Sequence, residues 1–513
     1  MITIQVSILD IRAIEPVVMI SRQTAHQLRL RHTDIVNLIY DKNELVASPV
    51  VVQGFIEDGV VGISEFHANK LGVKQGSKVD ILARRPPQSY DLIKKKIGGY
   101  EWSANDVRSI VNDISRNRYT SMEIASFALV SQFQGYKENE LVEVAKSMAE
   151  AGTQFNFNEK TYDKHSIGGV PGNKITPIIV SIVAAAGLLI PKTSSRAITS
   201  PSGTADTMEV LCNVKFTPEE ISELAPKSRG MIVWNAPLNL SPLDNIVIDV
   251  KRQLGIDPPD QMLASIVSTK IAMGVDGLVF DIPTGYGTKM KDRKVATKYA
   301  HSLIGLCRNL GIDVEAALTL GEQPLGFNIG PALEAQEALR VLENVKTDNV
   351  RAVSVKEKSV ELAGILFEIA KICPPGKGAA LAEEYLTSGK ALKKFKEIVE
   401  IQGGDKNITS ESVTIGDYNS EIPAPKDGYI ASIDNKIIKN VCTAAGTPRD
   451  KGAGIILHAK VGEFVHEGEK LFTIYSDTEA KLSLAIQTAT TQLPFTIEGM
   501  IISRVSSIPE KNI

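Results

Sequence analysis

The amino-acid sequence predicts a multidomain α/β protein, and three observations carry that prediction. The chain has 513 residues, which is enough for roughly three or four domains. The spacing of its apolar residues changes from strand-like alternation in the first 85 residues to helical spacing near residue 103, and to a mixture from residue 161. Hydrophobic residues make up 43% and charged residues 23% of the chain, as in ordinary globular proteins.

Residues 1–85 are expected to form a small N-terminal β-barrel. Short stretches such as 2–8, 45–51 and 78–82 alternate apolar and polar positions between glycines, which is the pattern of half-buried strands. Residues 60–73 read as strand, short helix, turn and strand, a succession similar to that of double-psi barrels. Because no catalytic grouping is visible here, we expect a role in packing or assembly, with DNA binding as the less favoured alternative.

Residues 90–160 are expected to form a helical domain after a linker at Arg84-Arg85-Pro86-Pro87, since prolines disfavour helix and sheet interiors. Capping residues from Ser103 precede apolar positions at helical spacing. Thr120-Ser121-Met122-Glu123 has the capping-box pattern of a second helix, and a third is expected over 138–151. Helices from about 176–225 are expected to pack with this segment.

Residues 161–405 are expected to form the central α/β domain. Apolar stretches at 190–193, 231–234 and 278–281 predict buried strands separated by helices, and such alternation is typical of helices packed on a sheet. The longest apolar run, 175–190, is too short for a membrane span and is interrupted by Pro177, so it predicts a buried helix.

A polar stretch rich in Gly, Asn and Ser around 402–420 is expected to be a linker, and residues 420–505 are expected to form a C-terminal α+β domain. Residues 425–430 and 461–468 resemble a barrel-sandwich hybrid of the lipoyl or biotinyl type. A carrier of that type displays a lysine at a hairpin tip in a Met-Lys-Met or Asp-Lys-Ala context. The sequence has no such context here, which favours a structural role.

The charge, the cysteines and the first residues of the chain disfavour several classes of binding partner. The net charge of −3 gives no support for a nucleic-acid partner. The four cysteines are widely scattered, which is typical of reduced thiols and shows no metal-ligand pairing. The first residues lack the basic-then-apolar layout of a signal peptide. We therefore expect a cytoplasmic protein without a membrane partner.

Two stretches rich in glycine and hydroxyl groups are the most informative part of the chain. Residues 164–174 read Lys-His-Ser-Ile-Gly-Gly-Val-Pro-Gly-Asn-Lys, and residues 193–206 read Thr-Ser-Ser-Arg-Ala-Ile-Thr-Ser-Pro-Ser-Gly-Thr-Ala-Asp. Glycines let the backbone approach a ligand closely, and N–H groups at helix starts bind anions. These stretches indicate an enzyme that holds phosphate and a sugar together.

The same stretches resemble the thymidine phosphorylase family of nucleoside phosphorylases. The resemblance rests on Lys-His-Ser-x-Gly-Gly and on Ser-x-Arg-x-x-Thr-x-x-x-Gly-Thr-x-Asp-x-x-Glu, which ends at Glu209. The segment from Val170 to Lys174 is similar to the archaeal branch of that family, the AMP phosphorylases. The resemblance runs from about residue 90 to the C-terminus, and the additional N-terminal segment fits the archaeal branch.

The resemblance implies a fold, a reaction and partners. The central domain is expected to be of the nucleoside phosphorylase type. The reaction is expected to convert a nucleoside 5′-monophosphate and phosphate into free base and ribose 1,5-bisphosphate, with AMP as the first candidate substrate and CMP and UMP as others. Phosphate is a co-substrate, no cofactor or metal is implied, and the expected assembly is a homodimer, with a higher homo-oligomer as the alternative.

The resemblance also assigns a phosphate site made of one lysine, several hydroxyls and a glycine N–H. Its residues are Lys164, Ser166, Gly168, Thr176, Ser194 and Thr204. Lysine supplies a compact cation, and hydroxyls donate hydrogen bonds without net charge. A single hydroxyl is more often a helix cap, but the set spans two motifs and favours phosphate.

The nucleotide site is assigned in the same way. Its residues are Gly169, Ser195, Arg196, Ala197, Ile198, Thr199, Ser200, Thr204, Ser265 and Lys289. A 5′-phosphate needs compensating charge when it is buried. Lys289 is expected to supply it, with Arg196 and the neighbouring hydroxyls. The alternative is that Lys289 is a solvent-facing loop lysine.

Two residues are candidates for handling the proton of the leaving base. Asp257 precedes the helix that carries Ser265, and the resemblance suggests it as the general acid. Partial burial would raise the pKa of such a carboxyl; the alternative is a helix cap followed by Pro258. His165 titrates near neutrality and is the other candidate, with contact to the sugar or base as its more favoured role.

One departure from the pyrimidine enzymes bears on the base. Those enzymes carry a base-binding lysine four residues after the helical serine, where this chain has Thr269. Lys270 is adjacent but points about 140° away from Ser265 on a helix. A relaxed base preference is therefore expected.

Three alternatives stay open. A pyrimidine nucleoside phosphorylase would not require the 5′-phosphate. A phosphoribosyltransferase of the anthranilate type would need Mg²⁺ held by acidic residues, and the sequence shows no adjacent Asp-Glu pair in a suitable loop. A non-catalytic assembly or carrier protein would carry a covalent adduct visible by mass.

Overall fold

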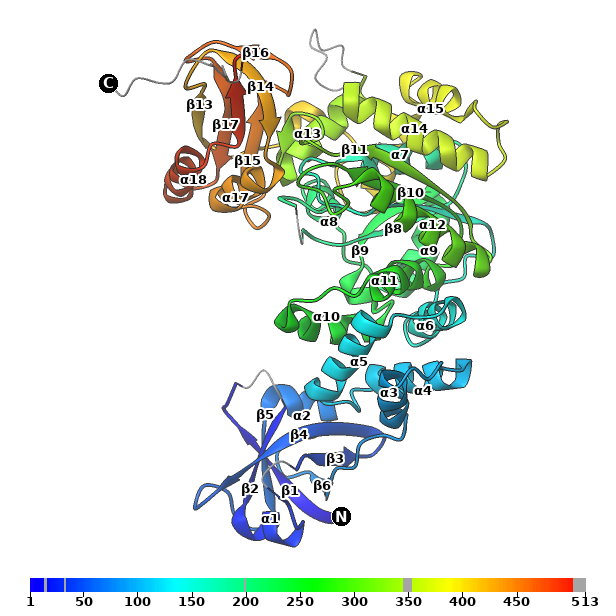
Figure 1. The fold of residues 1–513 in the computed structure, drawn as a ribbon, viewed down its shortest axis with the longest axis vertical. Helices are drawn as coiled ribbons and strands as arrows, with labels where there is room; N and C mark the ends of the chain where they lie inside the picture. The colour runs from blue at the N-terminus through cyan, green and yellow to red at the C-terminus, as the bar shows by residue number, and fades with distance from the viewer. Residues whose placement is uncertain (13–15, 32–33, 198–199, 345–352, 502–513) are drawn as a thin grey trace, which may run out of the picture. The chain divides into compact units, whose positions relative to one another are not determined.

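The computed structural model describes residues 1–12, 16–31, 34–197, 200–344 and 353–501. The chain forms two compact units (Figure 1). Unit 1 combines Met1–Gly152 with Ser241–Thr269, and unit 2 combines Thr153–Leu240 with the chain from Lys270 onward. The helices and strands of each unit are as follows.

The N-terminal part of unit 1 is a closed six-stranded barrel, which confirms the predicted β-barrel. Its strand order is β1-β5-β2-β4-β3-β6, and antiparallel pairing of β1 with β6 closes it. Its elements are β1 (Ile2–Leu9), β2 (Val17–Ser21), α1 (Arg22–Gln27), β3 (Val36–Tyr40), β4 (Asn43–Val52), β5 (Val60–Ser64), α2 (Glu65–Leu71) and β6 (Lys78–Ala83). Alternate side chains, such as Val18 and Ile20 on β2, fill the barrel interior, as the period of two in a strand dictates.

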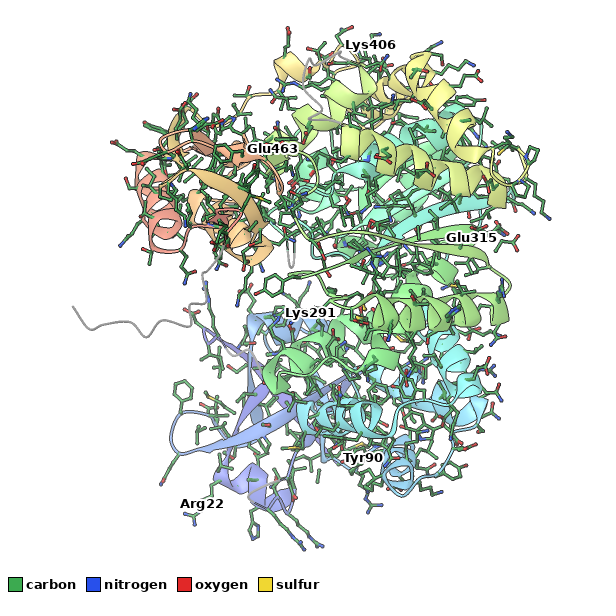
Figure 2. All side chains as sticks on the ribbon, turned by 45° about the horizontal axis from the view of Figure 1, so that its top comes forward. Arg22, Tyr90, Lys291, Glu315, Lys406 and Glu463 are labelled. Carbon is green, nitrogen blue, oxygen red and sulfur yellow. The ribbon has the colours of Figure 1, made fainter. Side chains whose placement is uncertain are left out.

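The helical part of unit 1 contains the helices predicted after Ser103, after Thr120 and over 138–151, whereas its first helix, over 89–97, was not predicted. Its elements are α3 (Ser89–Ile97), α4 (Ala104–Ser115), α5 (Ser121–Gln134), α6 (Glu138–Glu150), α10 (Pro242–Leu254) and α11 (Pro259–Ala272), the last as far as Thr269. Capping boxes form at Ser103 and at Thr120. Tyr90 of α3, labelled in Figure 2, has its hydroxyl 3.3 Å from that of Ser126 on α5.

Hydrogen bonds of Arg84 hold the expected linker at residues 84–87 against the helical part. Arg84 is buried and donates hydrogen bonds to both carboxylate oxygens of Glu123, at 2.9 and 2.6 Å, and to the carbonyl oxygen of Arg118 at 2.6 Å. A bidentate contact of this kind fixes geometry. The barrel is therefore joined to α5 by a buried ion pair.

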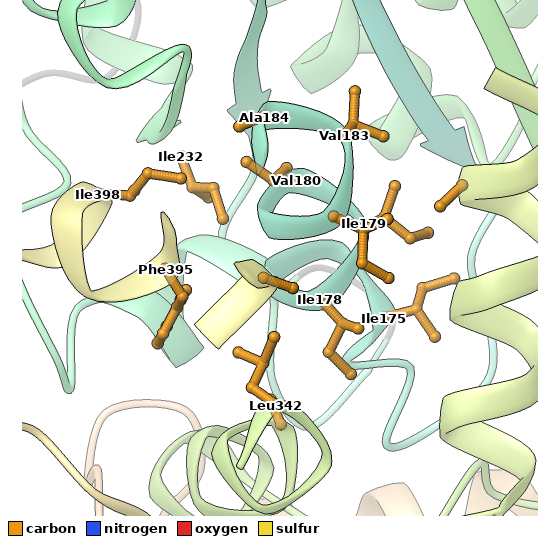
Figure 3. Close-up of a cluster of buried hydrophobic side chains, with 14 of the residues drawn as sticks. Ile175, Ile178, Ile179, Val180, Val183, Ala184, Ile232, Leu342, Phe395 and Ile398 are labelled. Carbon is orange, nitrogen blue, oxygen red and sulfur yellow. The ribbon is translucent and has the colours of Figure 1, made fainter. Parts of the chain in front are cut away.

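The expectation that helices from about 176–225 join the helical segment is wrong. α7 (Ile175–Ala185), α8 (Thr204–Met208) and α9 (Pro218–Ser228) belong to unit 2. The residues of α7 from Ile175 to Ala184 are all buried, and a helix that is apolar all round belongs inside a core. In Figure 3 its side chains lie among Ile232 of β9, Leu342 of α13 and Phe395 of α16.

The central part of unit 2 contains two parallel sheets. One has the order β11-β10-β7 and the other pairs β8 with β9. The strands are β7 (Thr161–Ser166), β8 (Ile190–Ser194), β9 (Gly230–Trp234), β10 (Val275–Thr284) and β11 (Asp313–Leu320). The predicted strands at β8, β9 and β10 are confirmed, whereas β7 and β11 were not predicted. The remaining helices are η1 (Ala236–Leu238), α12 (Arg293–Asn309), α13 (Pro331–Leu342), α14 (Val353–Ile369), α15 (Gly378–Thr387), α16 (Lys390–Ile401) and η3 (Ser410–Ser412).

The C-terminal part of unit 2 is a small α+β domain with its own apolar core, as predicted. One sheet has the order β12-β15-β17-β13, and the other has β16-β14-β18. Its elements are β12 (Asn328–Ile329), β13 (Tyr418–Pro423), β14 (Gly428–Ile433), α17 (Asn435–Ala445), β15 (Gly454–Leu457), β16 (Phe464–Val465), β17 (Lys470–Ser476), α18 (Glu479–Thr491) and β18 (Phe495–Glu498). Because β12 comes from the central segment, the two parts share a sheet. Within the described residues, no helix is long and apolar enough to cross a membrane.

Candidate functional site

The carboxyl ends of parallel strands place the two glycine-rich stretches. β7 ends at Ser166 and β10 ends at Thr284, and the two strands are parallel, with Ser166 opposite Asp281. A parallel bridge between Thr161 of β7 and Leu189, the residue before β8, places β8 beside β7. β8 ends at Ser194. In open α/β sheets, ligands bind outside the carboxyl ends of the strands. The loops that follow β7, β8 and β10 therefore border one candidate site.

Three of the predicted phosphate residues lie in one chain of contacts. The Nζ of Lys164 on β7 is 3.0 Å from the hydroxyl oxygen of Thr176 on α7. The hydroxyl of Thr204, at the start of α8, is 3.4 Å from that of Thr176. Lys164 and Thr176 are almost completely buried. The structure thus brings together side chains from both sequence motifs.

Buried cations outnumber the carboxylates that pair with them at this place. Lys192 and Lys270 share Asp163, at 3.2 and 2.7 Å. Lys358 lies 3.0 Å from Asp281. Lys164 adds a further buried ammonium group beside these pairs. A buried excess of positive charge is unfavourable unless an anion compensates it, so the cluster is suited to phosphate.

Burial lowers the pKa of Lys164 to about 7. The neighbouring ammonium groups of Lys192 and Lys358 contribute to this lowering of the pKa, while Asp281 and Asp163 act in the opposite direction. An anion bound at Lys164 would favour the charged form. The lysine can therefore take up a proton as phosphate binds.

Asp281 is a site residue to which the sequence assigned no role. It is buried and accepts a hydrogen bond of 2.5 Å from the hydroxyl of Ser166 and one of 2.6 Å from Thr319. Burial would raise its pKa, but Lys358, Lys164 and the two hydroxyls outweigh burial and lower it. Asp281 remains ionised and holds Ser166 at the end of β7.

The glycines after β7 are required by backbone geometry. Gly168 and Gly169 have φ angles of +85° and +97°, a region that side chains with Cβ rarely adopt. A Cβ on Gly169 would lie 3.1 Å from the backbone nitrogen of Lys289. The loop after β7 therefore packs directly on the loop after β10, and two predicted nucleotide residues meet there.

The loop after β8 is organised by Asp206, which is buried. Its carboxylate accepts hydrogen bonds from the backbone N–H of Ala197 at 2.7 Å and of Gly203 at 3.1 Å. A Cβ on Gly203 would lie 2.5 Å from the carbonyl carbon of Arg196. The loop thus folds back on itself. Ile198 and Thr199 lie outside the described residues, and Ser200 donates to the carbonyl oxygen of Ser202.

Arg196 is already paired with carboxylates. It donates to Asp206 at 2.9 Å and to Glu209 at 2.6 Å, and its guanidinium lies over Trp234. The hydrogen bonds that Arg196 donates to Glu209 and Asp206 raise its pKa despite some burial. Arg196 therefore stiffens the loop as well as being a candidate for the 5′-phosphate. Ser194, at the end of β8, donates to the carbonyl oxygen of Ser195 at 3.3 Å.

The C-terminal domain contacts both nucleotide loops. The Nζ of Lys451 is 2.9 Å from Glu209 and 3.4 Å from Asp206. Asn435, the first residue of α17, donates a hydrogen bond to the carbonyl oxygen of Gly321. A Cβ on Gly287 would lie 3.2 Å from the Cβ of Asn435. These contacts connect residues far apart in the sequence, so the sequence alone gave no signal for them.

Lys289 has an exposed side chain, as the solvent-facing alternative expected. It follows the glycines of the loop that continues to Lys291, labelled in Figure 2. Its backbone is held against Gly169. The ammonium group is therefore carried by a fixed backbone at the edge of the candidate site.

His165 is neutral near physiological pH. Partial burial and the charges of Lys270, Lys192, Lys164 and Lys289 lower its pKa well below the usual 6.5. Its ring meets that of Phe280 edge-on, with centroids 6.0 Å apart. A neutral imidazole donates from one nitrogen and accepts at the other, which fits contact with a sugar better than delivery of a proton.

The proton-donor candidate Asp257 and the base candidate Ser265 lie in unit 1, while the other site candidates within the described residues lie in unit 2. The expected partial burial of Asp257 is wrong: its side chain is 64% exposed, 3.6 Å from the Nζ of Lys251. It follows the C-terminal end of α10. Ser265 instead donates a hydrogen bond of 2.7 Å to Asp244. Among the described residues, no three His, Cys, Asp or Glu side chains gather into a metal-ligating group.

Comparisons with known families match most of the chain. Residues 90–152 match the helical bundle domain of the glycosyl transferase family, and residues 158–392 match its α/β domain. Residues 429–496 match the C-terminal domain of pyrimidine nucleoside phosphorylases. The three matches follow the helical, central and C-terminal parts of the fold.

Full-length relatives are more specific. The chain is 42% identical over 486 residues to AMP phosphorylase 1 of Archaeoglobus fulgidus, covering 94% of this chain and 95% of the relative. It is 42% identical to AMP phosphorylase of Thermococcus kodakarensis and 41% identical to that of Methanocaldococcus jannaschii. These matches cover 98% and 99% of this chain, and 99% and 100% of the relatives.

A solved structure shares the fold. Anthranilate phosphoribosyltransferase of Thermus thermophilus matches with a TM-score of 0.52 at 18% identity, covering 61% of this chain and 99% of that chain. At this identity the likeness concerns the architecture alone.

Proposed function

The chain belongs to the AMP phosphorylase family, and we propose that it converts AMP and phosphate into adenine and ribose 1,5-bisphosphate in nucleotide catabolism. The observation that carries the proposal is the buried cluster of Lys164, Lys192, Lys270 and Lys358, whose ion pairs within the described part of the chain involve two aspartates, Asp163 and Asp281. Such a cluster supplies the charge that a phosphate nucleophile needs.

Phosphate is placed by the residues that meet at the end of β7. Lys164 and Thr176 donate to its oxygens, with Thr204, Ser166 and Ser194 at the border of the site. One phosphate oxygen attacks C1 of the ribose as the bond from C1 to the base nitrogen breaks. Catalysis here consists of positioning and electrostatic stabilisation.

The nucleotide lies along the loops after β8 and β10. The backbone of residues 195–200 and of Gly169 borders the sugar, and Lys289 reaches the 5′-phosphate. Lys289 is exposed in the free protein, so it can contact the ligand without breaking an existing ion pair among the described residues. Ser265 contacts the base. CMP and UMP are further candidate substrates.

The departing base needs a proton. Asp257 delivers it in this proposal, so its carboxylate must first take up a proton as its contact with Lys251 loosens on substrate binding. His165 contacts the sugar as a neutral ring. We further propose that the enzyme acts in the cytoplasm as a homodimer and requires no metal, since lysines and backbone donors supply the positive environment.

One assay tests the proposed function. The purified chain is incubated with phosphate and AMP, CMP, UMP, adenosine or thymidine, and the sugar product is identified by phosphorus NMR and mass. We expect free adenine and a ribose carrying phosphates at C1 and C5 from AMP, in the presence of a chelator. Turnover confined to thymidine would indicate a pyrimidine nucleoside phosphorylase. Activity lost with the chelator and restored by Mg²⁺ would indicate a phosphoribosyltransferase.

A further inference from the structure

The hydroxyl proton of Ser265 has a defined partner. Ser265 lies on α11, and its oxygen is 2.7 Å from Oδ2 of Asp244, in the first turn of α10. An ionised carboxylate only accepts hydrogen bonds, whereas a serine hydroxyl has a single proton to donate. The proton of Ser265 therefore points at Asp244, and the lone pairs of its oxygen remain for a ligand.

The next residue on the same helix face, Thr269, also has its hydroxyl proton engaged. Thr269 lies four residues after Ser265, so the two side chains are neighbours on α11. Its hydroxyl donates 2.8 Å to the carbonyl oxygen of Ile266. Both side chains are only partly buried. Each hydroxyl donates its single proton within the protein, so each can only accept a hydrogen bond from a ligand.

Lys270, the residue after Thr269, adds no donor to that face. Its ammonium group is buried and lies 2.7 Å from Asp163. The face formed by Ser265 and Thr269 is thus an acceptor face.

We propose that Asp244 is a positioning residue that sets base preference: by taking the proton of Ser265 it makes the base site accept hydrogen bonds, so that nucleotides with an exocyclic amino group are preferred. AMP and CMP carry that group, while IMP and UMP carry an oxo group in its place. The inference rests on the proposed function, because it uses the contact between Ser265 and the base.

The surroundings of Asp244 raise its pKa overall, because burial outweighs the hydrogen bond from Ser265 and the charge of Lys251, which both lower it. The charge of Asp257 adds to the rise. The hydrogen bond donated by Ser265 favours the ionised form of Asp244. An oxo oxygen in place of the amino group would set its lone pairs against those of Ser265, and a site built for a hydrogen bond rejects such an analogue strongly.

The test compares matched nucleotides on the full-length protein. We would measure kcat/KM for AMP against IMP and for CMP against UMP, at saturating phosphate. The variants are Asp244→Asn, Ser265→Ala and the control Asp249→Asn. Asp249 lies on the same helix as Asp244, is exposed and pairs only with Arg252 among the described residues.

The wild type should favour the amino member of both pairs by about tenfold or more. In Asp244→Asn the side-chain amide can donate to Ser265, whose proton then turns to the base. The AMP/IMP and CMP/UMP ratios should fall by about tenfold or more, with turnover of IMP and UMP rising. Ser265→Ala should bring both ratios towards one, and Asp249→Asn should leave them unchanged.

Other outcomes overturn the inference. Equal kcat/KM for both members of each pair in the wild type would do so. A uniform loss on all four nucleotides in Asp244→Asn, in a variant with the thermal midpoint of the wild type, would also do so, because a purely structural role acts on every base alike. If Asp244→Asn does not fold, unchanged ratios in Ser265→Ala overturn it instead. Absence of phosphorolysis on every nucleotide would reject the proposed function itself.

Discussion

The Nζ of Lys451, in the C-terminal domain, lies 2.9 Å from the carboxylate of Glu209 in the central domain. Glu209 and Asp206 also hold Arg196, so three charged side chains of one loop meet a lysine from another part of unit 2. Both partners bring Glu209 a positive charge, and the hydrogen bond from Arg196 followed by that from Lys451 lowers its pKa to about 2 despite some burial. The C-terminal domain therefore supports the nucleotide loop.

Replacing Lys451 by alanine should loosen that loop without removing a ligand group. We expect KM for AMP to rise about two- to fivefold, because partly exposed ion pairs contribute at most about 1 kcal/mol. KM for phosphate should stay unchanged. Steady-state kinetics with each substrate varied measures both. Lys426→Ala, at an exposed lysine of the same domain, is the control, and an equal rise in both KM values would contradict the assignment.

Lys164 should make phosphate binding depend on pH. Its pKa is about 7 in the free protein, so its charged fraction falls as the pH rises through 7. KM for phosphate should therefore increase from about pH 6.5 to about pH 8.5 beyond the trend set by phosphate ionisation. Lys164→Arg keeps its charge over this range and should flatten that additional increase, whatever its effect on kcat. Parallel curves for the two proteins would contradict the expectation.

Lys164 should also make the stability of the folded protein depend on pH. Its folded pKa is depressed below the unfolded value near 10.4, so the unfolded chain binds more protons between about pH 7 and pH 10. This group alone therefore makes the free energy of unfolding rise with pH across that window. In the difference between wild type and Lys164→Met, urea unfolding should show the wild type gaining stability as the pH rises. The opposite slope would mean that Lys164 is charged throughout.

His165 should not produce a titration near its usual pKa. Burial and the neighbouring lysines depress its pKa, so the ring becomes charged only well below pH 6.5. His165→Gln should lower kcat/KM by up to about tenfold through a lost neutral hydrogen bond and leave the shape of the profile between pH 6 and 8 unchanged. His301→Gln, at an exposed position, serves as the control. An acid limb near pH 6.5 that disappears in His165→Gln would instead make it the proton donor.

The sequence predicts the parts of the fold that depend on local pattern. The capping boxes at Ser103 and Thr120 and the apolar strands β8, β9 and β10 follow from spacing alone. β7 does not, because its buried positions include Asp163 and Lys164, which are buried only by virtue of partners on other elements. A strand of this kind reads as a loop until its tertiary pairs are known.

The residues of the candidate site also fall into those that the sequence indicates and those that depend on tertiary contacts. Lys164 and Thr204 belong to the two motifs, and both lie within 3.4 Å of the Thr176 hydroxyl, which neither motif includes. Asp244 accepts a hydrogen bond from Ser265, 21 residues further along the chain, and in the sequence it reads as an ordinary acidic residue of a first helical turn. Lys451 has no local signal at all. Asp257 was expected to be partly buried because the resemblance suggests it as a general acid, yet its side chain is largely exposed.

Lys289 and Lys164 should separate the two anion sites. Lys289→Ala removes a charge-assisted contact to the 5′-phosphate, worth roughly 1.5–3 kcal/mol when buried by the substrate. We expect a loss of about ten- to hundredfold in kcat/KM for AMP and little change for the weak turnover of adenosine, which lacks that phosphate. Lys164→Ala should reduce turnover of both substrates, because the attacking phosphate is common to both. Lys291→Ala, two residues from Lys289 and also exposed, controls for surface charge near the loop. Equal losses on AMP and adenosine in Lys289→Ala would mean that the lysine acts on the phosphate nucleophile or on the loop itself, and not on the 5′-phosphate.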